Sequence, residues 1–163
     1  MPGQKEEGSM SKLGAPTAEE LAKRLEVLEE DKAILQTLYR YGHSIDYGLE
    51  QEWISLFTED GTFELRFRKT GVSLRHEGQA ALANFIASHT RAPDKYHKHL
   101  IIEPIIKLRG KNKATVESYF LRVDESEGKV FILAFGRYHD RMVKQAGQWR
   151  FQERIAEIEA LQE

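Results

Sequence analysis

The chain of 163 residues contains no cysteine. This absence excludes disulfides, thiolate nucleophiles, iron–sulfur clusters and cysteine-based zinc sites. Long hydrophobic runs are also missing, because no apolar segment approaches the roughly 20 residues that are needed to span a bilayer. Residues 1–8 lack the apolar segment of a secretory signal. We therefore expect a cytoplasmic protein that has no membrane partner.

An excess of charge of one sign is lacking as well. Lysine and arginine number 24 against 26 aspartate and glutamate residues, which leaves a formal net charge of −2. Proteins that bind nucleic acids usually carry a basic face or stripe, so we expect no nucleic-acid partner. The sequence also has no glycine-rich phosphate loop, which argues against a nucleotide cofactor.

The first half of the chain is predicted to be mainly helical. Residues 1–15 are rich in glycine, serine, lysine and glutamate and are predicted to form an unstructured leader, and residues 16–160 are predicted to form a single domain. Thr17 and Glu20 have the spacing of a capping box, and leucines at helical spacing follow to about Asp46. Two further helices are expected over residues 50–57 and 79–89.

The second half is predicted to consist of long strands that are joined by tight turns. The expected strands are residues 62–67, 97–108, 114–123, 130–143 and 149–159. Helices followed by antiparallel strands indicate an α+β fold, with the helices packed on one face of a curved sheet. Such sheets often cover an exposed part by self-association, so a homodimer or homotrimer is expected.

An ordered set of short motifs resembles the SnoaL-like branch of the nuclear-transport-factor-2-like (NTF2-like) superfamily over roughly residues 20–156. The motifs are Leu38-Tyr-Arg-Tyr41 with Ile45-Asp46, Trp53 with Leu56-Phe-Thr-Glu-Asp-Gly61, His97-Lys-His99-Leu100, Gly136-Arg-Tyr138-His-Asp140 and Gly147-Gln-Trp149. The branch is similar to scytalone dehydratase, hexachlorocyclohexane dehydrochlorinase and the polyketide cyclases. The resemblance implies a cone, the cystatin-like α+β barrel, in which a bent antiparallel sheet wraps around three helices and encloses a pocket for a small lipophilic molecule.

The same resemblance implies a catalytic pair. In the related lyases, an aspartate at the end of the first helix pairs with a histidine on the first long strand, and this histidine takes a proton from carbon. Asp46 and His99 match the two positions. The chemistry is sensible without the family, because a neutral imidazole is the best general base near neutral pH and a carboxylate can orient it.

Three tyrosines are predicted to bind the substrate. Tyr41 and Tyr138 fall where related enzymes have polar residues that face the pocket. Tyr119 falls where scytalone dehydratase has a second histidine, and a phenol is a poor base near neutral pH, which argues against a dehydration that needs two histidines. Arg154 is expected to be a solvated arginine on a strand.

Other interpretations stay open at this point. His97, His99 and Asp46 could form a metal triad, but a third neutral ligand is missing and the related enzymes need no metal, so no metal and no cofactor are predicted. The predicted function is a cofactor-free lyase, isomerase or cyclase. The alternatives are a non-catalytic protein that binds a small ligand, or a structural subunit similar to the β-subunit of ring-hydroxylating dioxygenases.

Overall fold

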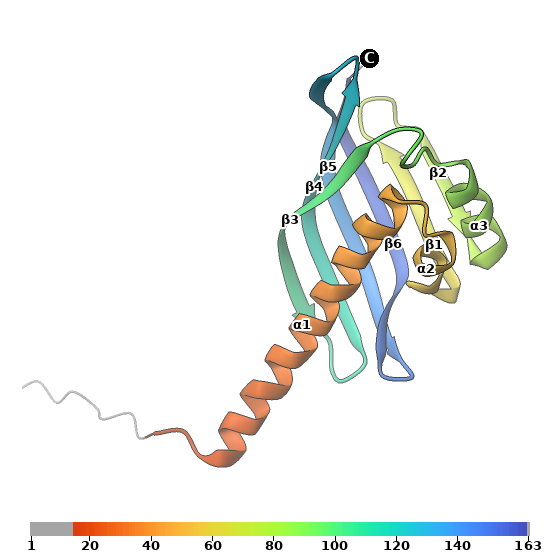
Figure 1. Ribbon diagram of the computed structural model, residues 1–163. Coiled ribbons are helices and arrows are strands. Elements are labelled where there is room, and N and C mark those ends of the chain that lie inside the picture. The colour runs from red at the N-terminus through yellow and green to blue at the C-terminus, as the bar shows by residue number, and fades with distance from the viewer. Residues whose placement is uncertain (1–14, 163) are drawn as a thin grey trace, which may run out of the picture.

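The computed structural model describes residues 15–162, so the predicted leader lies outside the described residues except for its last residue. The fold is α+β, as predicted, with helices against one face of a curved sheet (Figure 1). The helices are α1 (Ala18–Asp46), α2 (Glu50–Ser55) and α3 (Gly78–Ser88). The strands are β1 (Phe57–Phe67), β2 (Ser73–Glu77), β3 (His97–Leu108), β4 (Lys113–Ser126), β5 (Lys129–Gln145) and β6 (Gln148–Leu161).

The strands form one sheet in the order β2-β1-β6-β5-β4-β3. Every neighbouring pair is antiparallel except β1 and β6, which run parallel. The sequence indicates the hairpins from β3 to β6, but it does not indicate where β6 meets the separate β1–β2 hairpin. Strand β2 was not predicted, because its residues lie at the sheet edge and are mostly exposed, so they show no alternation of apolar and polar residues.

The long helix α1 begins at the predicted capping box. The backbone N–H of Thr17 donates to Glu20 Oε2 at 2.8 Å, and the backbone N–H of Glu20 donates to Thr17 Oγ1 at 3.2 Å. The N-terminal half of α1 extends beyond the sheet, and its second half crosses the face of the sheet (Figure 1). Within residues 15–162, no helix has both the length and the apolar character that crossing a membrane would require.

Aromatic rings form the core between α1, α2 and the sheet. Trp53 packs on Phe57 with ring centroids 4.8 Å apart, and Tyr41 packs on Trp53 at 5.8 Å. Phe63 and Phe151 complete this cluster, and all five rings are almost fully buried. Because burial of one large apolar side chain contributes about 1.5–3 kcal/mol, this cluster holds the C-terminal half of α1 firmly against β1 and β6.

Candidate active site

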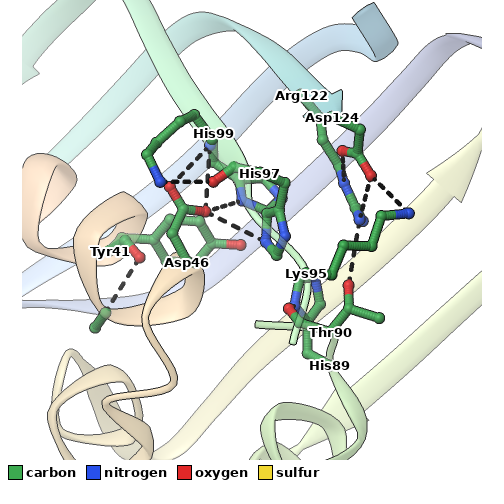
Figure 2. Close-up of polar contacts among 11 residues, drawn as sticks. Tyr41, Asp46, His89, Thr90, Lys95, His97, His99, Arg122 and Asp124 are labelled. Carbon is green, nitrogen blue, oxygen red and sulfur yellow. Dashed lines mark hydrogen bonds and ion pairs between the residues drawn. The ribbon is translucent and has the colours of Figure 1, made fainter. Parts of the chain in front are cut away.

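Asp46 is the last residue of α1, where a carboxylate is electrostatically unfavourable because the C-terminal end of a helix carries partial negative charge. It is nevertheless 3% exposed. Hydrogen bonds from His99 on β3 stabilise the buried carboxylate of Asp46. The backbone N–H of His99 donates to Asp46 Oδ2 at 3.1 Å and Oδ1 at 3.3 Å, and the ring Nδ1 lies 2.6 Å from Oδ1 (Figure 2). The structure therefore brings the two predicted catalytic residues into direct contact.

The contact determines which ring nitrogen of His99 is free. An ionised carboxylate only accepts hydrogen bonds, so Nδ1 carries the proton and donates it to Asp46. The second nitrogen, Nε2, then keeps its lone pair. Because His99 lines a cavity between the sheet and the helices, this arrangement offers an oriented base to a molecule in that cavity.

The cavity that His99 lines has a volume of about 230 Å³ and lies between the sheet, α1 and α3. Its other lining residues are Tyr41, Ile45, Phe63, Leu65, Phe67, Phe85, His89, Phe120, Arg122, Leu133, Ala134, Tyr138, Ala156, Ile158 and Leu161. Most of these side chains are apolar. The volume lies below the range of about 300–1,000 Å³ that is typical of drug-sized ligand sites, so the cavity suits a small apolar molecule.

Three hollows in the described part of the chain are larger than this cavity. One of about 360 Å³ is lined by residues of β3, β4 and β5, among them Tyr119 and Arg137, and contains no histidine. A hollow of about 480 Å³ is lined mainly by polar and charged side chains, such as Arg75, Arg109 and Glu153, and contains no histidine.

A hollow of about 380 Å³ lies on the other side of Asp46, where residues of α1 and the start of β3 form its walls. This hollow also includes Asp46 and His99 in its walls. Only the smaller cavity combines His99 with the buried Tyr41 and Tyr138, so it is the better candidate for a substrate site.

Tyr41 and Tyr138 line the cavity, as predicted, and are 1% and 2% exposed. Their rings meet edge to face at 5.8 Å. Burial raises the pKa of Tyr138 to about 12, and burial also raises the pKa of Tyr41 well above its usual value. Both phenols therefore stay protonated near neutral pH. Tyr41 donates a side-chain hydrogen bond to Tyr138, so the hydroxyl of Tyr138 is the one that remains available as a donor.

Tyr119 does not line this cavity, in contrast to the expectation that it lies in the pocket with Tyr41 and Tyr138. Its side chain is 53% exposed, whereas the next residue on β4, Phe120, is 4% exposed and lines the cavity. Successive residues of a strand point to opposite faces of the sheet. Because Phe120 faces the cavity, Tyr119 faces the outer side of the sheet.

Arg154 is fully buried, which contradicts the expectation of a solvated arginine. Its Nε and one terminal nitrogen each donate to Asp140 at 2.8 Å. The guanidinium also lies 4.2 Å from the ring centre of Tyr41 and 4.1 Å from that of Tyr138. The Asp140–Arg154 pair thus packs against the rings of the two tyrosines that line the cavity. The sequence did not indicate this pair, because each residue alone resembles a charged residue of the surface.

The rings of His97 and His89 both lie next to the ring of His99. The sequence did not indicate that His89 lines the cavity. The ring of His97 is fully buried, neither of its nitrogens has a hydrogen-bond partner, and Nε2 lies 3.5 Å from Asp46 Oδ1. His89 follows α3, and its Nδ1 lies 2.7 Å from the carbonyl oxygen of Thr90. Burial, with a smaller contribution from the neighbouring His99, lowers the pKa of each ring to about 4. Both rings are therefore neutral near pH 7.

Arg122 is a further polar residue of the cavity wall that sequence reasoning did not identify. Its guanidinium donates to Asp124 at 2.8 and 3.2 Å and to the hydroxyl of Thr90 at 3.3 Å. Lys95 also lies 3.1 Å from Asp124. These contacts tie the segment between α3 and β3 to β4 and so position His89 beside the cavity.

Comparison with solved structures places this arrangement in a known fold. An NTF2-like protein with a cystatin-like fold from Novosphingobium aromaticivorans is 22% identical, covers 89% of this chain and 92% of its own, and superposes with a TM-score of 0.75. A Mycobacterium tuberculosis protein of unknown function is 28% identical, with a TM-score of 0.71 and coverage of 91% of this chain and 79% of its own. These structures confirm the predicted fold.

A third solved structure carries the name of an enzyme. It is a Novosphingobium aromaticivorans protein that is provisionally named scytalone dehydratase, with 25% identity, a TM-score of 0.67 and coverage of 84% of this chain and 89% of its own. No curated protein matches the chain significantly. The sequence model that describes the SnoaL-like domain matches residues 26–155, which is most of the chain and includes Asp46 and His99. The chain therefore belongs to the SnoaL-like domain family.

Proposed function

We propose that the protein catalyses a cofactor-free proton abstraction from carbon, as a lyase, isomerase or cyclase that acts on a small lipophilic carbonyl compound. The observation that carries the proposal is the 2.6 Å contact between Asp46 and Nδ1 of His99, at the wall of a cavity with mostly apolar walls. A positioned general base of this kind contributes typically about 10²- to 10⁴-fold in rate.

The proton path follows from the free nitrogen of His99. Nε2 takes a proton from the carbon beside the carbonyl group, and the electron pair of the broken C–H bond moves onto the carbonyl oxygen as an enolate. The imidazolium that forms is stabilised by the carboxylate of Asp46. In a lyase, the enolate then expels a leaving group from the adjacent carbon, whereas in an isomerase the imidazolium returns the proton to a different carbon.

The buried tyrosines complete the proposed chemistry. The enolate oxygen needs hydrogen-bond donors that are already in place, because such donors stabilise developing charge most strongly in a site that excludes water. Tyr41 and Tyr138 line the same cavity as His99 and remain protonated near neutral pH. We assign Tyr138 the role of donor to this oxygen, with Tyr41 donating in turn to the hydroxyl of Tyr138.

The proposal can be tested without knowing the product. A thermal-shift screen of small ketones and β-hydroxy ketones identifies compounds that bind, and each is then incubated with the protein in D₂O. Proton abstraction appears in the NMR spectrum as exchange of the carbon-bound proton for deuterium. The wild type is expected to catalyse exchange, and Asp46→Asn and His99→Gln are each expected to slow it by about 10²-fold or more.

The control is His139→Gln, because His139 lies on β5 and does not line the cavity. This variant should exchange at the wild-type rate. Undiminished exchange in His99→Gln would reject the assignment of the base. Compounds that bind the wild type but never exchange would instead support the alternative of a non-catalytic binding protein.

A further inference from the structure

Three histidine rings face one another at the edge of the cavity (Figure 2). Ring centroids are 5.3 Å apart for His89 and His97, 5.6 Å for His89 and His99, and 5.2 Å for His97 and His99. One nitrogen from each ring lies within 4.8 Å of the other two. His97 and His99 share one face of β3 because side chains alternate along a strand, and the segment after α3 delivers His89 to the same point.

His97 gives independent evidence that this cluster receives a ligand. Its side chain is fully buried, and neither ring nitrogen has a hydrogen-bond partner. Nε2 lies 3.5 Å from Asp46 Oδ1, whereas Nδ1 has no polar partner at all among the described residues. Buried polar groups are nearly always satisfied, so an imidazole with two unsatisfied nitrogens is an exception that needs an explanation. A bound cation at the centre of the three rings would satisfy one of them.

The hydrogen bonds around the cluster have the pattern of a metal site. Histidine ligands usually donate the N–H of the other ring nitrogen to a carboxylate or a backbone carbonyl. His99 contacts the carboxylate of Asp46 through Nδ1, and His89 contacts the carbonyl of Thr90 through Nδ1. Nε2 of both rings is thereby left free to bind.

We propose that His89, His97 and His99 bind a divalent transition metal ion, with Zn²⁺ as the ion that suits three neutral imidazoles in a tetrahedral site. Zn–N bonds of about 2.0–2.1 Å place ligand nitrogens about 3.4 Å apart. The ligand nitrogens, which lie within 4.8 Å of one another, would therefore have to approach by up to about 1.4 Å when the ion binds. Because His89 and His99 line the cavity, the fourth position opens toward it.

The metal site regulates the proposed function, and this consequence rests on that function. The ion binds Nε2 of His99, the nitrogen that takes the proton in the proposed reaction. Metal binding and proton abstraction then exclude each other, so Zn²⁺ inhibits the enzyme by occupying its base.

The test is a calorimetric titration of the full chain, free of any affinity tag and stripped of metal by a chelator, with Zn²⁺. One ion per chain is expected to bind. Titration with Co²⁺ should give the visible absorption bands of a tetrahedral site. His89→Gln should weaken Zn²⁺ binding by more than the roughly 10- to 100-fold that is lost with an outer hydrogen-bond partner of a ligand. His139→Gln, outside the cluster, should bind like the wild type.

The outcomes separate the two proposals. Absence of saturable Zn²⁺ binding, or equal affinity in His89→Gln and His139→Gln, would overturn the metal site and leave the proposed reaction standing. Saturable binding by a stripped protein that catalyses no proton exchange would support the metal site and overturn the reaction. His89 is only partly buried, so its variant keeps the test meaningful even if a variant of the fully buried His97 fails to fold.

Discussion

Gly42 and His99 are in such close contact that a β-carbon added to Gly42 would lie 2.9 Å from the carbonyl oxygen of His99. Gly42 precedes Asp46 by one helical turn, so it determines how closely the end of α1 approaches β3. The closeness of the two backbones is what allows Asp46 to accept hydrogen bonds from both the ring and the backbone N–H of His99.

Replacing Gly42 with alanine is expected to separate the Asp46–His99 pair. Alanine favours a helix over glycine by about 1 kcal/mol, but the clash is with a backbone atom, and such overpacking costs about 1–3 kcal/mol. Because a displacement of about 1 Å can cost up to 10²-fold in rate, we expect slower proton exchange at unchanged or lower stability. The NMR signal of the Nδ1 proton of His99 should also shift toward that of a free imidazole.

The control for this change is Gln36→Ala, at an exposed position of the same helix. It should alter stability by no more than about 0.5 kcal/mol and leave proton exchange unchanged. Wild-type exchange and an unshifted Nδ1 signal in Gly42→Ala would show that the close approach of the two backbones does not position the pair.

Removing the hydroxyl of Tyr138 separates its proposed chemical role from its packing. Tyr138→Phe keeps the ring, which stacks on Phe120 with centroids 4.7 Å apart, but removes the donor. Loss of one preorganised donor to an oxyanion costs about 10²- to 10³-fold in rate. Proton exchange should fall by this factor while the melting temperature changes little.

Tyr119→Phe makes the same chemical change on the outer face of the sheet, where Tyr119 is 53% exposed. Its proton exchange should equal that of the wild type. If the two variants exchanged at the same rate, the assignment of Tyr138 as a donor would be wrong.

The contact between Asp46 and His99 could be predicted because of the resemblance to the SnoaL-like branch. This resemblance pairs an aspartate at the end of the first helix with a histidine on the first long strand, and Asp46 and His99 match these positions. Tyr119 was misplaced because both faces of β4 carry apolar side chains, such as Tyr119 and Leu121 on one and Val116 and Phe120 on the other. Alternation alone then cannot distinguish the inner face.

Other parts of the site depend on contacts between distant segments. His89 lies beside the other two histidines because of the conformation of the segment between α3 and β3. Apolar and polar periodicity in the sequence does not predict the conformation of such a segment. Arg154 is buried because Asp140 faces it across the β5–β6 pairing, close to a shift of register between Arg141 and Met142. Local sequence patterns do not predict such irregularities.

The buried pair of Asp140 and Arg154 is expected to be more important for stability than any exposed ion pair. Asp140→Asn leaves a fully buried guanidinium without its compensating charge, and breaking a buried pair in this way costs about 3–5 kcal/mol. The free energy of unfolding, measured by urea denaturation, should fall by this amount.

Glu52→Gln is the control, because Glu52 pairs with Arg40 at 2.8 Å and these side chains are 37% and 49% exposed. Exposed pairs contribute about 0–1 kcal/mol, so this variant should retain nearly all of the stability. A loss in Asp140→Asn as small as that in Glu52→Gln would show that the guanidinium of Arg154 is compensated by the aromatic rings alone.

The carboxylate of Glu30 connects the middle of α1 to the sheet through hydrogen bonds with side chains of β5 and β6. The strength of this connection depends on pH. Lys144 donates to Glu30 at 2.5 Å, and Nε1 of Trp149 donates to it at 2.7 Å. The hydrogen bond from Lys144 holds the pKa of Glu30 below its usual value, although burial alone would raise it. A carboxylate with a lowered pKa in the folded state stabilises the fold above the unfolded-state pKa of about 4.3, and this stabilisation disappears as the pH falls through the folded-state pKa.

We therefore expect Glu30→Gln to reduce the free energy of unfolding by about 1–2 kcal/mol near neutral pH, because glutamine still accepts from Trp149 but carries no charge for Lys144. The difference from the wild type should shrink toward zero as the pH falls through the lowered pKa of Glu30. Glu19→Gln is the control, since Glu19 pairs with Lys23 in a fully solvated setting, and it should change stability by less than about 0.5 kcal/mol at any pH. A difference between Glu30→Gln and the wild type that stayed constant from neutral to acid pH would show that the charge of Glu30 does not hold α1 to the sheet.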